Sequence, residues 1–185
     1  MREVDVMGVR VEMPSNQPIV LLREVAGDRY LPIWIGAVEA TAIAFAQQGV
    51  TPPRPLTHDL LKDVLEATGN ALEEVRITDV KDGVFFATLV LTSGTEVSAR
   101  PSDSIALALR TGSRIVCSED VLDRAECRVP GLAELVDEMA ISVLGKGGGP
   151  RAVVAAFEEI PRVELFEQGS GVGGAQLPFG RRVAG

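Results

Sequence analysis

The sequence predicts an α+β fold in which short helices pack on a mixed, mostly antiparallel sheet. Short runs of alternating apolar residues recur along the chain, and turn residues such as Asp82-Gly83 separate them. Helical patterns follow directly on the ends of several of these runs. Apolar residues make up 46% of the 185 residues and aromatic residues only 4%, so we expect a core of Val, Leu, Ile and Ala.

The pattern in the first third of the chain predicts a three-stranded unit followed by a helix. The strands are expected at residues 4–13, 19–25 and 29–35. The alternation of the first strand slips near Met7-Gly8, which indicates a bulge. The helix is expected over residues 37–48, with Ala40 and Ile43 on one face, and Gly49 ends it.

A second helix begins after the proline-rich linker 51–55, which fixes an extended backbone. We expect Thr57 as its N-cap, His58 at its first position and Asp59 in its first turn. Its buried stripe is expected to consist of Leu60, Leu61, Val64 and Leu65.

The remaining elements alternate between strands and short helices. Strands are expected at 73–80, 84–91, 95–100 and 114–117, and helices at 102–111, with Ser102 as N-cap, and 119–127. The character of the sequence changes near Pro130. We therefore expect a core domain over 1–130, a helical appendage over 131–167 and a glycine-rich, disordered tail over 168–185.

Charge and cysteine content limit the function classes. The net charge is −8 and no segment forms a basic arm, which argues against strong binding to duplex nucleic acid. Cys117 and Cys127 lack metal-ligand spacing, so we expect reduced thiols. Neither a signal peptide nor a transmembrane run is evident, and we expect a soluble cytoplasmic protein without a membrane partner.

Polar residues gather at three expected helix starts. These residues are Glu39, the group Thr57-His58-Asp59, and Ser102-Asp103 preceded by Arg100. Each group alone is ordinary capping chemistry. Together they suggest a site, because helix N-termini bind anions and carboxylates at the same place bind divalent cations. If Glu39, Asp59 and Asp103 converge, they would form a metal site with His58 beside it.

Three ordered segments resemble the bifunctional nuclease family, a domain of bacteria and plants. The segments are Leu31–Gly36 followed by Glu39-Ala40, Arg54–Leu61, and Arg100–Ala108. The resemblance covers roughly residues 1–128. It implies a nuclease, with both DNase and RNase activity, that acts on single-stranded DNA or RNA.

A mechanism follows from the resemblance together with the chemistry of the two substrates. DNA has no 2′-hydroxyl, so water must attack the phosphodiester, activated by a base or a metal ion. The expected catalytic residues are His58 as base with Glu39, Asp59 and Asp103, and these three carboxylates would hold Mg²⁺ or Mn²⁺. Arg54 and Arg100, with Thr57 and Ser102, would contact the substrate phosphates.

Two other functions remain open at this stage. The acidic charge and the lack of a basic groove are compatible with a non-enzymatic oligomeric scaffold or regulatory protein. The helix starts are compatible with a small-anion pocket, for example for a nucleotide. A homodimer is expected, because a small antiparallel sheet has exposed edges and Pro18–Val25 is apolar.

Overall fold

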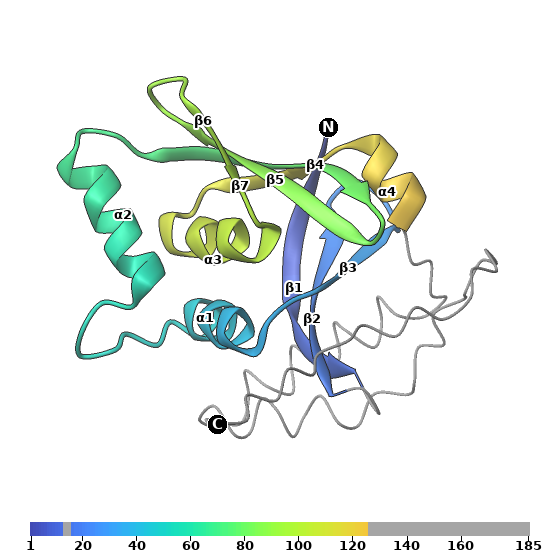
Figure 1. Ribbon diagram of the computed structural model, residues 1–185, viewed down its shortest axis with the longest axis horizontal. Helices are drawn as coiled ribbons and strands as arrows, with labels where there is room; N and C mark the ends of the chain where they lie inside the picture. The colour runs from blue at the N-terminus through green and yellow to red at the C-terminus, as the bar shows by residue number, and fades with distance from the viewer. Residues whose placement is uncertain (13–15, 126–185) are drawn as a thin grey trace, which may run out of the picture.

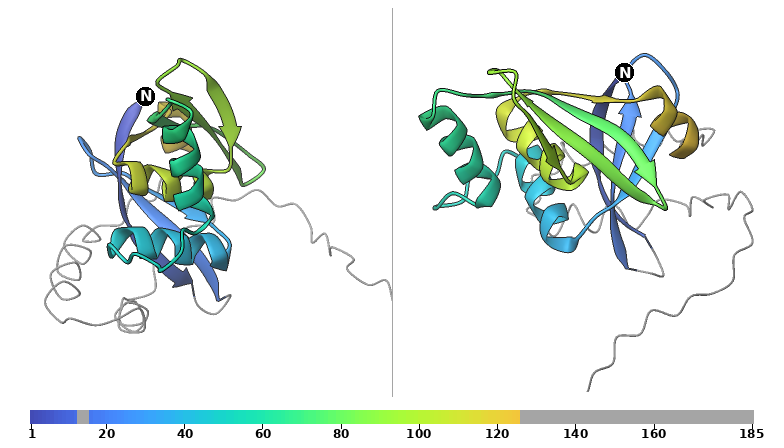
Figure 2. Two further views of the ribbon diagram at one scale, coloured as in Figure 1. Left: turned by 90° about the vertical axis from the view of Figure 1, so that its left-hand side faces the viewer. Right: turned by 45° about the horizontal axis from the view of Figure 1, so that its top comes forward.

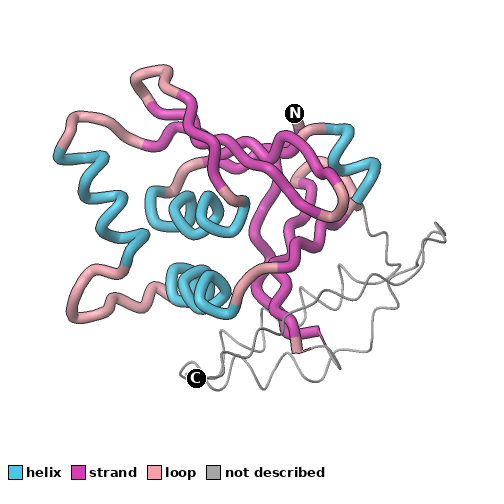
Figure 3. Tube along the Cα trace, in the orientation of Figure 1, coloured by secondary structure: helices cyan, strands magenta, loops and turns pink. Residues whose placement is uncertain are grey.

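The computed structural model describes residues 1–12 and 16–125, which fold into one seven-stranded mixed sheet with four helices (Figures 1 and 3). The strand order is β3-β2-β1-β7-β4-β5-β6. The expected α+β class is therefore confirmed. The second and third predicted domains, 131–167 and 168–185, lie outside the described residues, as does Cys127.

The first three strands form an antiparallel unit in chain order. They are β1 (Arg2–Glu12), β2 (Gln17–Glu24) and β3 (Tyr30–Trp34). The register of β1 against β2 shifts between Val6 and Gly8, which is the expected bulge. Gly8 has a φ of 153°, a conformation that side chains with a Cβ rarely adopt.

The second group of strands is joined to the first by β7 (Arg114–Cys117). An antiparallel hairpin pairs β4 (Leu72–Lys81) with β5 (Val84–Leu91), and β6 (Glu96–Ala99) pairs with β5. The hairpin turns at Asp82 and Gly83, both with positive φ, as a two-residue Asp-Gly turn requires. β7 pairs parallel with β4 and antiparallel with β1.

Two helices lie side by side against the sheet (Figures 1 and 2). The helix α1 (Ala37–Gln47) contacts β1 and β2, whereas α3 (Pro101–Thr111) contacts β4, β5 and β7. Their apolar side chains, among them Ile43, Ile105 and Leu107, are fully buried in one aliphatic core. α1 and α3 are thus held rigidly by the hydrophobic effect.

The helix α2 (Thr57–Ala67) is held differently. It stands at one end of the molecule and packs against α3 (Figures 1 and 2). The expected buried stripe is wrong: no residue of α2 is buried, and Leu60 and Val64 are 54% and 48% exposed. Leu65 alone among the expected stripe residues packs on the core. The reason is that α2 packs mainly against one neighbour, α3, so Leu60, Leu61 and Val64 have no second element to cover them.

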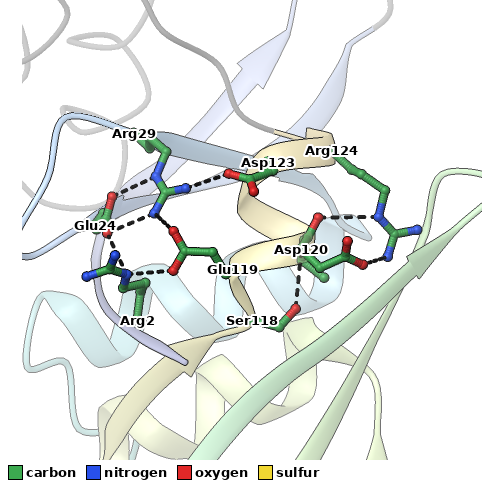
Figure 4. Close-up of polar contacts among 9 residues, drawn as sticks. Arg2, Glu24, Arg29, Ser118, Glu119, Asp120, Asp123 and Arg124 are labelled. Atoms are coloured by element: carbon green, nitrogen blue, oxygen red, sulfur yellow. Dashed lines mark hydrogen bonds and ion pairs between the residues drawn. The ribbon is translucent and has the colours of Figure 1, made fainter.

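The short helix α4 (Glu119–Ala125) lies at the end of the molecule away from α2, and ion pairs hold it in place (Figures 1 and 4). The guanidinium of Arg29 is buried and makes two hydrogen bonds to Glu24, of 2.8 and 3.0 Å. It also bonds to Glu119 at 2.9 Å and to Asp123 at 2.7 Å, both on α4. Arg29 therefore links the β2–β3 hairpin to α4.

The strand order removes one of the two reasons for expecting a dimer. Pro18–Val25 was expected to supply an apolar surface, but β2 lies between β1 and β3, and Val20, Leu21 and Leu22 are buried within the chain. The oligomeric state stays a prediction. None of the helices in the described part of the chain is long and apolar enough to cross a membrane.

Candidate active site

The starts of three helices are joined by Arg100 and Asp103. Arg100 is the N-cap of α3, and its Nη2 donates a hydrogen bond of 2.8 Å to Glu39, in the first turn of α1. Its Nε donates at 2.7 Å to Asp103, in the first turn of α3. Asp103 in turn faces His58 at the start of α2. The structure thus brings together Glu39, His58, Arg100 and Asp103.

His58 and Asp103 form an imidazole–carboxylate pair. The Nε2 of His58 is 3.3 Å from Oδ1 of Asp103, and the histidine side chain is 12% exposed. An ionised carboxylate only accepts hydrogen bonds, so the paired tautomer carries its proton on Nε2. The lone pair of Nδ1 then points away from the carboxylate. This arrangement is that of a base held by an acidic partner.

The charges of the site favour an ionised Asp103. Partial burial raises the pKa of this carboxyl, but hydrogen bonds from Arg100 and His58 outweigh burial and leave the pKa below its ordinary value. Arg100 itself is 67% exposed. Its Nη1 makes no hydrogen bond to a described residue, so two N–H groups remain to meet an anion.

The carboxylate of Glu39 lies against Gly36, the N-cap of its helix. A Cβ added to Gly36 would stand 2.2 Å from Oε2 of Glu39. No side chain at this position could coexist with the observed carboxylate, since real Cβ atoms do not approach other atoms that closely. The absence of a side chain at Gly36 therefore leaves room for the observed position of the Glu39 carboxylate.

Asp59 belongs to a separate pair. One of its oxygens accepts a hydrogen bond of 2.8 Å from the backbone N–H of Leu56, and the other accepts one of 2.5 Å from Nε of Arg110. Burial raises the pKa of Asp59, but the bonds from Leu56 and Arg110 outweigh it and lower the pKa overall. Asp59 thus caps α2 and binds α3 instead of facing Glu39 and Asp103.

The expected three-carboxylate metal site is not formed in this structure. Among residues 1–12 and 16–125, no three His, Cys, Asp or Glu side chains are grouped so that they could hold a metal ion. Each of the three expected carboxylates is bound by a guanidinium: Glu39 and Asp103 by Arg100, and Asp59 by Arg110. The residues as arranged do not fit a divalent cation, and the metal ligands remain a prediction.

The expected phosphate-binding residues differ in accessibility. Arg54 and Thr57 are exposed, whereas Ser102 is buried. Neither Thr57 nor Ser102 is an N-cap, contrary to expectation: the N-caps are Leu56 and Arg100. Pro101 takes the first position of α3, which proline favours, and Asp59 caps the amide of Leu56 from the third position of α2. His58 is consequently the second residue of its helix.

One residue of the site region was missed by the sequence analysis. Arg110 is in the last turn of α3, and its side chain is only 8% exposed. A cation in the last turn of a helix is expected from the helix dipole alone, so the pattern gave no reason to single it out. Besides the carbonyl of Ala106 one turn before it, its partners come from positions 42 and 59, which no local signal connects to it.

Known proteins match this chain over a region that includes all the site residues. The family model of the bifunctional nuclease domain matches residues 20–130. Uncharacterised proteins from two strains of Mycobacterium tuberculosis are 58% identical over 130 residues, which is 70% of this chain and 79% of each relative. Bifunctional nuclease 1 of Oryza sativa subsp. indica and the bifunctional nuclease of Oryza minuta are 30% identical over 111 residues, 57% of this chain and 33% of theirs. On these grounds, the chain belongs to the bifunctional nuclease domain family.

Proposed function

We propose that the chain is a nuclease that hydrolyses phosphodiester bonds in single-stranded DNA and RNA by attack of water. The observation that carries the proposal is the pairing of His58 with Asp103 beside Arg100. The names of the rice relatives, bifunctional nucleases, agree with it. The family also makes a nucleic acid the expected substrate.

Each residue has a distinct role in this proposal. Nδ1 of His58 accepts a proton from the attacking water, while Asp103 holds the ring and stabilises the imidazolium that forms. Arg100 presents the two N–H groups of Nη1 to a phosphate oxygen. Glu39 and Asp103 fix the plane of that guanidinium from two sides. Arg54 and Thr57 are proposed to contact phosphate further along the strand.

The substrates provide a test of water attack. We expect cleavage of labelled single-stranded DNA, of RNA and of RNA with 2′-O-methyl groups, without a 2′,3′-cyclic phosphate product. A 2′-hydroxyl nucleophile would instead leave both DNA and 2′-O-methyl RNA intact. Parallel reactions with Mg²⁺, Mn²⁺ or EDTA test whether cleavage needs a divalent metal.

The residues are tested with matched variants. His58→Gln should reduce cleavage by roughly 10²- to 10⁴-fold, the range expected for loss of a general base. Asp63→Asn, on the exposed side of α2, is the control and should cleave like the parent. Equal cleavage by His58→Gln and the parent, purified identically, would overturn the proposed site.

A second function is favoured by one observation, the apolar stripe of α2. Leu60, Leu61 and Val64 are exposed in the described structure, as they would be on a protein-binding helix. We propose a non-enzymatic scaffold or regulatory role as the alternative. Absence of cleavage on every substrate, with changed self-association in Leu60→Ser, would favour it.

A further inference from the structure

The guanidinium of Arg110 joins all three helices that carry the candidate site. Its Nε donates to Asp59 of α2 at 2.5 Å. Its Nη1 donates to the carbonyl of Ala42 in α1 at 3.1 Å and to that of Ala106 in α3 at 2.8 Å. The side chain is only 8% exposed, and its Nε and Nη1 are both bonded within the chain, so most of the guanidinium is part of the scaffold that holds the three helices.

The placement of α2 depends on polar contacts to an unusual degree. Because no residue of α2 is buried, little apolar area fixes the helix against α3. The neighbours His58 and Asp59 instead reach two positions of α3 that are seven residues apart, Asp103 and Arg110. Two positions so spaced lie about 10 Å apart along a helix, and together they fix both the position and the direction of the start of α2.

We propose that Arg110 is a positioning residue for His58. It anchors Asp59, and Asp59 sets the orientation of the first turn of α2, which aims the imidazole at Asp103. The planar fork of arginine serves three acceptors at once, and the single ammonium of lysine cannot reproduce this geometry. The effect on catalysis rests on the proposed function, whereas the effect on the imidazole rests on the contacts alone.

The chain contains one histidine, so its imidazole can be followed by NMR without ambiguity. We expect Arg110→Gln and Arg110→Lys each to shift the ring signals of His58 and to speed exchange of the Nε2 proton with water. Asp59→Asn should give the same changes, and the pair Asp59→Asn, Arg110→Gln should be no worse than either alone. Arg124→Gln, in α4, is the matched control and should leave the spectrum unchanged.

Catalysis provides the second measurement. For Arg110→Lys we expect kcat on single-stranded DNA to fall roughly 10- to 100-fold, the size of effect that misplacing a catalytic group produces. KM should change little, since Arg110 acts on His58 through Asp59 and α2, so the loss should fall on kcat.

The outcomes separate the two proposals. Unchanged His58 signals in a folded Arg110→Lys protein would overturn the positioning role, whatever the activity. Altered signals in a protein whose parent cleaves nothing would support the positioning role while refuting the nuclease. If Arg110→Gln does not fold, the Asp59→Asn variant decides by the same spectra.

Discussion

Nε2 of His58 lies 3.3 Å from Oδ1 of Asp103, although 45 positions separate the two residues in the chain. The contact joins the second residue of α2 to the first turn of α3. A well-packed helix, α3, thus holds the carboxylate, while an exposed helix, α2, carries the imidazole. The geometry of the pair therefore reports directly how α2 is docked.

Removing the charge of Asp103 should impair catalysis without unfolding the protein. Asp103→Asn leaves an amide that can still contact His58 but no longer stabilises an imidazolium, and we expect kcat to fall by about 10²- to 10⁴-fold. The measurement is single-turnover cleavage of labelled DNA, with Asp63→Asn as control. Full activity of Asp103→Asn at every pH would contradict the proposed role.

Stability should decline in acid through the arginine-bound carboxylates. The folded-state pKa of Asp59 and of Asp103 lies below the ordinary value of about 3.9. Their stabilising effect is therefore fully present above the unfolded pKa and is lost as pH falls through the folded pKa. Urea unfolding between pH 7 and pH 3 measures it.

Neutral variants of single carboxylates test the direction of this pH dependence of stability. Asp59→Asn should lower the free energy of unfolding at neutral pH and flatten its decline in acid. Asp63→Asn should preserve the parental slope. An unaltered slope in Asp59→Asn would show that its pair with Arg110 contributes nothing to acid sensitivity.

Breaking the Glu24–Arg29 pair should be costly. Both side chains are buried, and Arg29→Met leaves the carboxylate of Glu24 without its main partner. We expect the free energy of unfolding to fall by about 3–5 kcal/mol, as for other buried pairs that lose one member. Chemical denaturation measures the loss.

Replacing both Glu24 and Arg29 tests whether the loss of stability comes from the unpaired carboxylate of Glu24. In Glu24→Leu, Arg29→Met no buried carboxylate is left unpaired at this position, so most of the lost stability should return. A double variant less stable than Arg29→Met alone would mean that the pair is strongly favourable in itself.

Gly36→Ala should displace Glu39 from Arg100. The added Cβ would fall 2.2 Å from Oε2 of Glu39, so the carboxylate must move. We expect weaker substrate binding, seen as a higher KM, because Arg100 loses one of the two carboxylates that orient it. In a Glu39→Ala background the same substitution meets no carboxylate and should have no further effect on KM.

Cys117 should be inert toward thiol reagents in the folded protein. Burial raises the pKa of its thiol to about 12, so almost no thiolate exists at pH 8. In a Cys127→Ser background, a disulfide reagent should label the native protein negligibly and label it fully in denaturant. Rapid labelling of the native protein would contradict this prediction.

The local elements were predictable because their signals are local. The Asp82-Gly83 turn, the bulge at Gly8 and the glycine after α3 each impose a backbone conformation that few other residues accept. The alternation of apolar residues then fixes which face of each strand is buried. For the same reason, most helix and strand limits agree with the sequence to within a few residues.

The site was predictable only in part. Glu39, His58 and Asp103 were singled out because each stands at a helix start, and the structure connects them through Arg100. The separation of Asp59 was not predictable, since neighbouring residues of a helix point about 100° apart and only packing decides what each one meets. The role of Arg110 depends on the same packing.

The position of β7 has a consequence for the order of folding. Residues 114–117 are the only hydrogen-bonded link between the strands β1–β3 and β4–β6 in the described chain, and they pair with Arg2 and Glu3 at its very start. A nascent chain emerging from the ribosome therefore cannot close its sheet until nearly all of the described residues have been made. Until then its two β-ribbons remain separate units with open edges, and closure must await a contact of very high sequence separation.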